Sequence, residues 1–207
     1  MKVYLLNYVE KNIKEIILIT LIIFIGLIIG IIYINSLTDE NISKVDYYVN
    51  SVVDYIKELN CEESKIDNTV ILFSNLKRNI LYIMLIGLFS LCIIGLPIMY
   101  LLIGFKSFSL GYTMSAILAT LGTKSGIIFI CSSMILHNII YLIGIYLISI
   151  SGIDLYKEIV VNKSENIRLK IISHIIFIVI SVLISVFAAL VETFISNNLF
   201  IMLKDFI

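Results

Sequence analysis

A carboxylate and a histidine–asparagine pair lie within long apolar stretches of this sequence. Glu192 stands near the end of the last stretch, beside Thr193. An ionisable group in such surroundings is costly and is a candidate functional site, unless it reaches a nearby aqueous interface or hydrogen-bonds to a neighbouring helix. His137 and Asn138 lie in another apolar stretch, where the alternatives are a proton or ion relay and bonding between helices.

Small residues form a second kind of pattern. Gly104 and Gly111 bracket a short segment with a lysine and two serines, which predicts a tight turn or a close approach of helices. Gly26 and Gly30 form a GxxxG face, and a further ridge of small residues comprises Ser181, Ser185 and Ala189. Such faces allow helices to pack closely, which fits either a tightly packed bundle or a homodimer.

Recognisable catalytic and cofactor motifs are missing from the sequence. It contains no GxxxxGK[ST], no Rossmann GxGxxG, no HExxH and no GxSxG. The 3 cysteines form neither a CxxC pair nor a cluster with histidine at metal-ligand spacing. We therefore expect no catalytic residues, no metal site and no cofactor, and a protein that is not an enzyme.

The composition places the chain in a membrane. Hydrophobic residues make up 60% of it and charged residues 14%, against about 45–50% and 25% in soluble proteins. The mean hydropathy is +1.07. Because 15 basic residues balance 15 acidic ones, no overall basic field for nucleic acid exists. The lipid bilayer is the expected surrounding.

Five apolar runs are candidates for membrane-spanning helices, each to be compared with the roughly 20 residues that a bilayer requires. They predict an all-α integral membrane protein with five transmembrane helices and an amphipathic helical extracytoplasmic loop. Within the second run, Pro97 predicts a kink, and the short third run could instead be a re-entrant loop. The runs cover residues 16–34, 80–103, about 108–121, 127–150 and 171–195.

The distribution of lysine and arginine favours five spans with the N-terminus in the cytoplasm and the C-terminus outside. In this arrangement only Lys124 and Lys204 lie outside, apart from the first loop. A re-entrant third segment would instead place four bases of the 151–170 loop outside. The bases placed inside are Lys2, Lys11, Lys14, Lys106, Lys157, Lys163, Arg168 and Lys170.

The predicted outside loop, residues 35–79, is the largest polar part of the chain. Apolar residues at three- and four-residue spacing from Ile42 to Leu59 predict an amphipathic helix. A second helical stretch, residues 66–76, is expected to continue into the second span. The loop is too short for a catalytic domain with its own core, so it suits docking of a partner. Residues 1–15 and 151–170 are the expected cytoplasmic segments.

Four motifs, in this order, resemble the stage II sporulation protein M family. They are the entry to the second span around Asn75, the Gly104–Gly111 segment, Leu136-His137-Asn138, and Ala188-Ala-Leu-Val-Glu192. The resemblance covers nearly the whole chain. Two positions depart from the family pattern: Leu136 stands where proline is usual, and Tyr141 where glutamate is frequent. A role that requires that second carboxylate is therefore not expected here.

The resemblance implies a non-enzymatic scaffold in the sporulation engulfment machinery, in the septal membrane between mother cell and forespore. It would recruit or hold two peptidoglycan hydrolases, an amidase/endopeptidase and a lytic transglycosylase. The alternative is a permease- or channel-like membrane subunit, partnered by an ATPase, which Glu192, His137 and the Gly104–Gly111 segment motivate.

Overall fold

The computed structural model describes residues 10, 12–58, 68–92, 94–161 and 167–196. Most of the N-terminal segment, part of the first loop with Cys61, and the C-terminal residues with Lys204 lie outside this part of the chain. Within it every regular element is helical. The elements are α2 (Ile13–Asn35), α3 (Asp39–Glu58), α4 (Asn68–Ser90), α5 (Gly95–Phe129), α6 (Leu136–Tyr156) and α7 (Ile167–Leu190), with π-helical segments η1 (Ile130–Ile135), η2 (Lys157–Val161) and η3 (Val191–Ser196).

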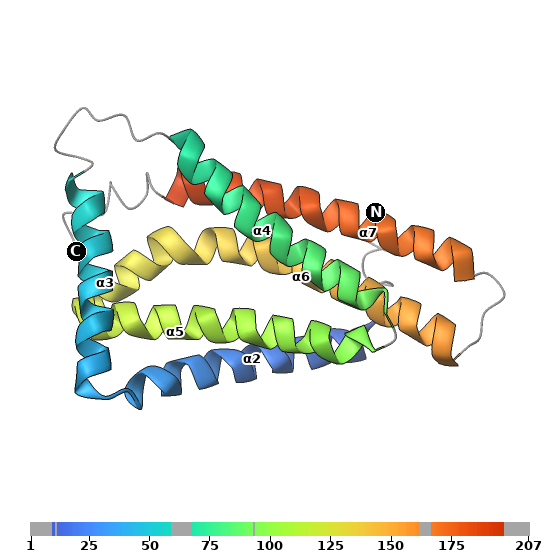
Figure 1. Ribbon diagram of the computed structural model, residues 1–207, viewed down its shortest axis with the longest axis horizontal. Helices are drawn as coiled ribbons and strands as arrows, with labels where there is room; N and C mark the ends of the chain where they lie inside the picture. Colours follow the sequence, from blue (N-terminus) through green and yellow to red (C-terminus); the bar gives the residue numbers. More distant parts are fainter. Residues whose placement is uncertain (1–9, 11, 59–67, 93, 162–166, 197–207) are drawn as a thin grey trace.

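Five of the α-helices run lengthwise, and α3 crosses them at one end of the bundle (Figure 1). We call this the α3 end. The starts of α2 and α7 and the turn between α4 and α5 lie at the opposite end. There, Lys157 pairs with Glu15, and the Lys170 Nζ lies 3.0 Å from the Glu158 Oε1.

Helix α5 contains a break at Gly122, which has φ 79° and ψ 168° inside an otherwise continuous helical stretch. A positive φ is costly for residues with a Cβ, so glycine suits this position. Past Gly122 the chain turns back, and Gly126 packs against Leu118: a Cβ built on Gly126 would lie 3.0 Å from Leu118 Cδ2. Residues 95–121 and 123–156 therefore form two arms of a helical hairpin (Figure 1).

Several helices are long and apolar enough to cross a membrane. Four helical runs in the described residues meet this requirement: Ile13–Asn35, Ile71–Ser90, Gly95–Val160 and Ile167–Phe194. The third has 66 residues. A straight helix of that length would extend about 100 Å, more than three times the thickness of a bilayer core, so the bend at Gly122 is needed to fit it.

The predicted second span, residues 80–103, is wrong as a single helix. Helix α4 ends at Ser90 and α5 begins at Gly95, with the Gly95 N–H donating to the Cys92 carbonyl at 2.9 Å. Pro97 lies in the first turn of α5 and does not kink a helix, because the N–H that proline lacks has no helical partner there. The predicted stretch 66–76 does continue into the span: from Asn68 it is part of α4.

Of the two alternatives for Gly104–Gly111, the tight turn is wrong and the close approach of helices is confirmed. Both glycines lie inside α5, where they face α2. The glycines of the GxxxG face lie opposite them, and a Cβ built on Gly26 would be 2.6 Å from the Gly104 carbonyl oxygen. Gly26 and Gly30 are buried by α5 of the same chain, so this face is not free for a homodimer.

The second ridge of small residues packs within the bundle as well. Ser181, Ser185 and Ala189 are fully buried, and the Gly144 backbone of α6 lies close to the Ser181 carbonyl. The main core lies between α2, α4, α5 and α6 and includes Ile19, Ile83, Met99, Ile145 and Ile148. The packing therefore confirms a tight helical bundle.

Candidate functional site

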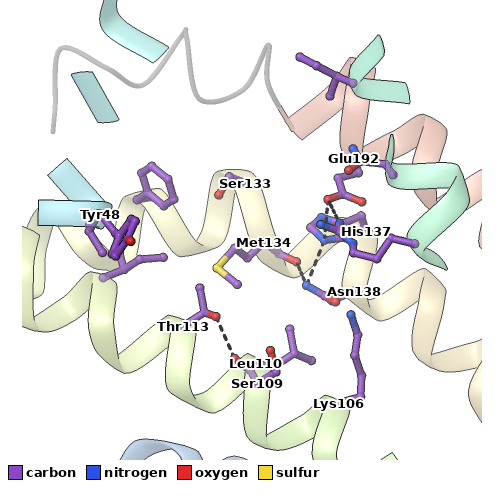
Figure 2. A pocket seen from close by; sticks show the side chains of 16 residues that line it. Tyr48, Lys106, Ser109, Leu110, Thr113, Ser133, Met134, His137, Asn138 and Glu192 are labelled. Atoms are coloured by element: carbon purple, nitrogen blue, oxygen red, sulfur yellow. Dashed lines mark hydrogen bonds and ion pairs between the residues drawn. The ribbon is translucent and has the colours of Figure 1, made fainter. Parts of the chain in front are cut away.

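A cavity of about 630 Å³, lined by both charged and apolar side chains, lies in the half of the bundle nearer the α3 end. Its walls come from α3, α4, α5, η1, α6 and η3 (Figure 2). Two of the three π-helical segments border it, and π-helical distortions often mark functional sites. The lining residues are Tyr48, Val49, Ile71, Asn75, Arg78, Lys106, Ser109, Leu110, Thr113, Ile117, Phe129, Ser133, Met134, His137, Asn138 and Glu192.

Glu192 connects three helical segments at one wall of the cavity. Its Oε1 lies 2.6 Å from Arg78 Nη2 on α4 and 3.9 Å from His137 Nε2 on α6. The Glu192 side chain is 17% exposed and that of Arg78 is 59% exposed. The carboxylate therefore bonds to the neighbouring helix α4 through Arg78, which was one of the two structural alternatives considered for it.

His137 and Asn138 lie at the start of α6, directly after the π-helical segment η1. The Asn138 Nδ2 donates to the Met134 carbonyl at 2.8 Å and lies 3.1 Å from His137 Nε2 (Figure 2). This bond assigns the acceptor role to His137 Nε2, with the ring proton on Nδ1. The pair is thus held as a unit facing Glu192.

Asn75 joins the same wall from α4. Its Nδ2 donates to Thr193 Oγ1 at 3.4 Å, and Thr193 donates to the Ala189 carbonyl at 2.9 Å. Asn75, His137, Asn138 and Glu192, which are separated by up to 117 residues in the sequence, therefore line one cavity.

Lys106 is a cavity residue whose position differs from the expectation. It was expected in a cytoplasmic turn, but it lies within α5 and points into the cavity (Figure 2). Its Nζ lies 5.2 Å from the centroid of the Tyr141 ring and 5.9 Å from that of Tyr82. Pro97 could have indicated this position from the sequence, because proline is tolerated in the first turn of a helix. A helix that begins near Pro97 runs through residues 95–121 and has Lys106 near its middle.

The four glycines named from the sequence lie away from the cavity. Gly26, Gly30, Gly104 and Gly111 all belong to the contact between α2 and α5. Their role is to let two helix backbones approach, which positions the face of α5 that carries Lys106 and Ser109 toward the cavity.

A second buried histidine has a structural environment. His174 Nε2 lies 2.8 Å from Ser90 Oγ, and its Nδ1 lies 2.9 Å from Ser151 Oγ. Because Ser90 donates to the Gly87 carbonyl, the ring donates from Nε2 and accepts at Nδ1. A neutral imidazole thus satisfies all its hydrogen bonds and ties α4, α6 and α7 together.

The cavity combines two basic side chains, one carboxylate and one imidazole. Arg78 and Lys106 outnumber Glu192, so the cavity carries a net positive charge when His137 is neutral. Among the described residues no group of three histidine, cysteine or acidic side chains is placed to hold a metal ion. The chemistry that this arrangement supports is binding of an anionic group or passage of an ion or proton.

Comparison with known proteins identifies one family. The family model of stage II sporulation protein M matches residues 19–197. No curated protein and no solved structure matches the chain. The matched segment includes α2 from Ile19 onward and continues through η3, and therefore covers every described wall of the cavity.

Proposed function

This chain belongs to the stage II sporulation protein M family, and on that premise we propose that it is a membrane scaffold of the engulfment machinery. Its partners in this proposal are the amidase/endopeptidase and the lytic transglycosylase that remodel septal peptidoglycan. The membership itself makes it a sporulation-related membrane protein, and the long apolar helices make it a multi-pass one.

The proposal includes five membrane spans. They are α2, α4, the two arms of the hairpin that turns at Gly122, and α7 with η3. The α3 end would face outward and the opposite end the cytoplasm, in the septal membrane. Bases near the opposite end support this orientation, since cytoplasmic ends of spans are enriched in lysine and arginine: Lys157, Arg168 and Lys170.

Helix α3 carries the proposal, because it offers an outward surface without being a domain. It crosses the bundle end (Figure 1). A hydrogen bond of 2.7 Å from Thr120 Oγ1 to Asp46 Oδ1 fastens it there. Tyr47 and Tyr48 are 72% and 69% exposed. Exposed tyrosines are typical anchors of protein interfaces, so these two are our candidates for contact with a hydrolase.

Affinity capture from sporulating cells tests the scaffold proposal. The tagged wild-type chain is expected to capture both hydrolases, and the double variant Tyr47→Ala/Tyr48→Ala to capture at least about tenfold less, as loss of interface anchors would require. Phe105→Ala is the matched control, since Phe105 is 66% exposed but lies in the middle of α5. Undiminished capture by the double variant would exclude α3 as the docking site.

The cavity favours a second candidate, a permease- or channel-like subunit partnered by an ATPase. Arg78, Lys106, His137 and Glu192 would then line a pathway. Purified protein in liposomes would show ion or solute flux that Glu192→Gln abolishes. Liposomes that remain tight with the wild-type protein and a captured ATPase would exclude this candidate.

A further inference from the structure

The charges of the cavity are unevenly paired. Arg78 and Glu192 form an ion pair at 2.6 Å, whereas Lys106 forms neither an ion pair nor a side-chain hydrogen bond with any residue that the structure describes. Its contacts are the faces of Tyr82 and Tyr141, which a cation favours but which do not neutralise it. The cavity therefore holds one cation in excess.

Lys106 lies deep within the bundle. It follows Gly95, the first residue of α5, by eleven positions, so its Cα is about 16 Å from that end. Residues 95–121 extend over about 40 Å, which places Lys106 near the middle of this arm. An unneutralised cation at such a depth is unfavourable in a membrane, so a lysine there usually has a partner.

The cavity walls are apolar between the charged groups. Ile71, Leu110, Ile117, Phe129 and Met134 are part of the lining. The cavity, with its volume of about 630 Å³, therefore has room for a molecule with one charged and one apolar part.

Besides Lys106, the lining contains two buried atoms without a hydrogen-bond partner among the described residues, His137 Nδ1 and the acceptor Glu192 Oε2. A ligand that satisfied Lys106 and Glu192 would present an anion to Lys106 and a hydroxyl or ammonium donor to Glu192.

We propose that this cavity binds the headgroup of an anionic membrane phospholipid, with its phosphate at Lys106. The phosphate oxygens accept from Lys106 Nζ, and a headgroup hydroxyl donates to Glu192 Oε2. The acyl chains follow the apolar walls. Free phosphate shares the anion but not the apolar part, so the depth of Lys106 and the apolar lining favour the lipid. The phosphate position at Lys106 lies on α5, away from the α3 surface proposed for the hydrolases, although Tyr48 of that surface also lines the cavity.

Native mass spectrometry of the full chain, released from detergent, tests the proposal. Phosphatidylglycerol and phosphatidylcholine are offered together at equal concentration. The wild-type protein is expected to retain phosphatidylglycerol, and millimolar inorganic phosphate is expected to leave it bound. Equal retention of both lipids would overturn the site, and displacement by inorganic phosphate would overturn the lipid as its ligand.

Variants locate the lipid at Lys106. Lys106→Gln is expected to lower phosphatidylglycerol retention by about tenfold to a hundredfold, the effect of one hydrogen bond to a charged group, whereas Lys106→Arg retains it. Lys77→Gln is the matched control, because Lys77 is exposed on α4 and does not line the cavity. Equal losses in Lys106→Gln and Lys77→Gln would show non-specific attraction and overturn the proposal. If a variant fails to fold, the competition between phosphatidylglycerol and phosphatidylcholine for the wild-type protein still tests whether the cavity prefers the anionic lipid.

Discussion

A methyl group added at Gly30 should force α2 and α5 apart, whereas one added at Gly104 should not. A Cβ on Gly30 would lie 2.7 Å from the Tyr112 backbone nitrogen and 3.1 Å from the Gly111 carbonyl carbon. A Cβ on Gly104 would have Ile22 Cγ2 as its nearest neighbour, at 3.6 Å. Both glycines lie inside helices of the same contact, so Gly30→Ala and Gly104→Ala form a matched pair.

The expected magnitude follows from these distances. Non-bonded heavy atoms are most favourable at about 3.5–4.0 Å, so Gly30→Ala requires a local separation of about 1 Å. Overpacking of this kind costs about 1–3 kcal/mol, while the higher helix propensity of alanine returns at most about 1 kcal/mol. Gly104→Ala is stabilised by the higher helix propensity of alanine and has no overpacking cost. We expect the two variants to differ in free energy of unfolding by about 2 kcal/mol.

Size-exclusion chromatography of heated, detergent-solubilised protein measures the difference as a shift in apparent melting temperature. Gly30→Ala should melt below the wild type and Gly104→Ala at or slightly above it. Equal shifts, or a larger loss at Gly104, would refute the assigned contact between α2 and α5. An inter-chain crosslink that Gly30→Ala weakens without lowering the melting temperature would indicate that Gly30 instead meets a second copy of the chain.

Three further predictions use the same assay. In a double-mutant cycle, Arg78→Gln and Glu192→Gln should show a coupling of about 0.5–1 kcal/mol, small because Arg78 is largely exposed; additive effects would contradict the ion pair. His174→Phe leaves Ser151 without its acceptor and should destabilise by about 1–3 kcal/mol, and an unchanged melting temperature would contradict the three-helix hydrogen-bond link. Gly122→Ala should cost about 1–2 kcal/mol through its backbone alone, since nothing lies within 4 Å of the added Cβ, and no cost would contradict the positive φ.

The long helices at the two ends of the sequence were predictable because their apolar runs are bounded by charge. Lysines precede the first run, and Arg168 and Lys170 precede the last. Both runs are helices in the structure, α2 and α7. Such runs have one stable arrangement in a bilayer, because each must satisfy its own backbone hydrogen bonds.

The boundary between the second and third runs could not be found from hydropathy. The turn after Ser90 is itself apolar, with Leu91 and Cys92 on the α4 side and Ile94 before Gly95. Typical turn residues, glycine and serine, are concentrated instead around residues 104–111, which are helical. There the small residues allow the close contact with α2. A segment rich in glycine and serine can therefore be a turn or a helix in close contact, and only the packing distinguishes the two.

Sequence analysis named several of the cavity residues one by one but did not predict that they line one cavity. Asn75, His137, Asn138 and Glu192 were all named from the sequence, and the structure brings them to one wall. No spacing rule places them together, because they belong to different helices whose relative positions depend on the whole bundle. Lys106 was missed because its segment was interpreted as a loop, where a lysine is ordinary.

The energetics of Lys106 bear on whether the protein is only a scaffold. A lysine near the centre of a spanning helix costs about 2.5–3.5 kcal/mol, and contact with aromatic faces such as Tyr82 and Tyr141 returns about 1–2 kcal/mol. About 1–2 kcal/mol is left, which a hydrogen bond from the ammonium to a phosphate, worth about 1.5–3 kcal/mol, would offset. Holding enzymes outside the membrane does not require such a cation. Lys106→Met should therefore stabilise the protein in neutral detergent, and the wild type should regain that difference when phosphatidylglycerol is added. A wild type that gains nothing from the lipid would leave Lys106 without the partner assigned to it.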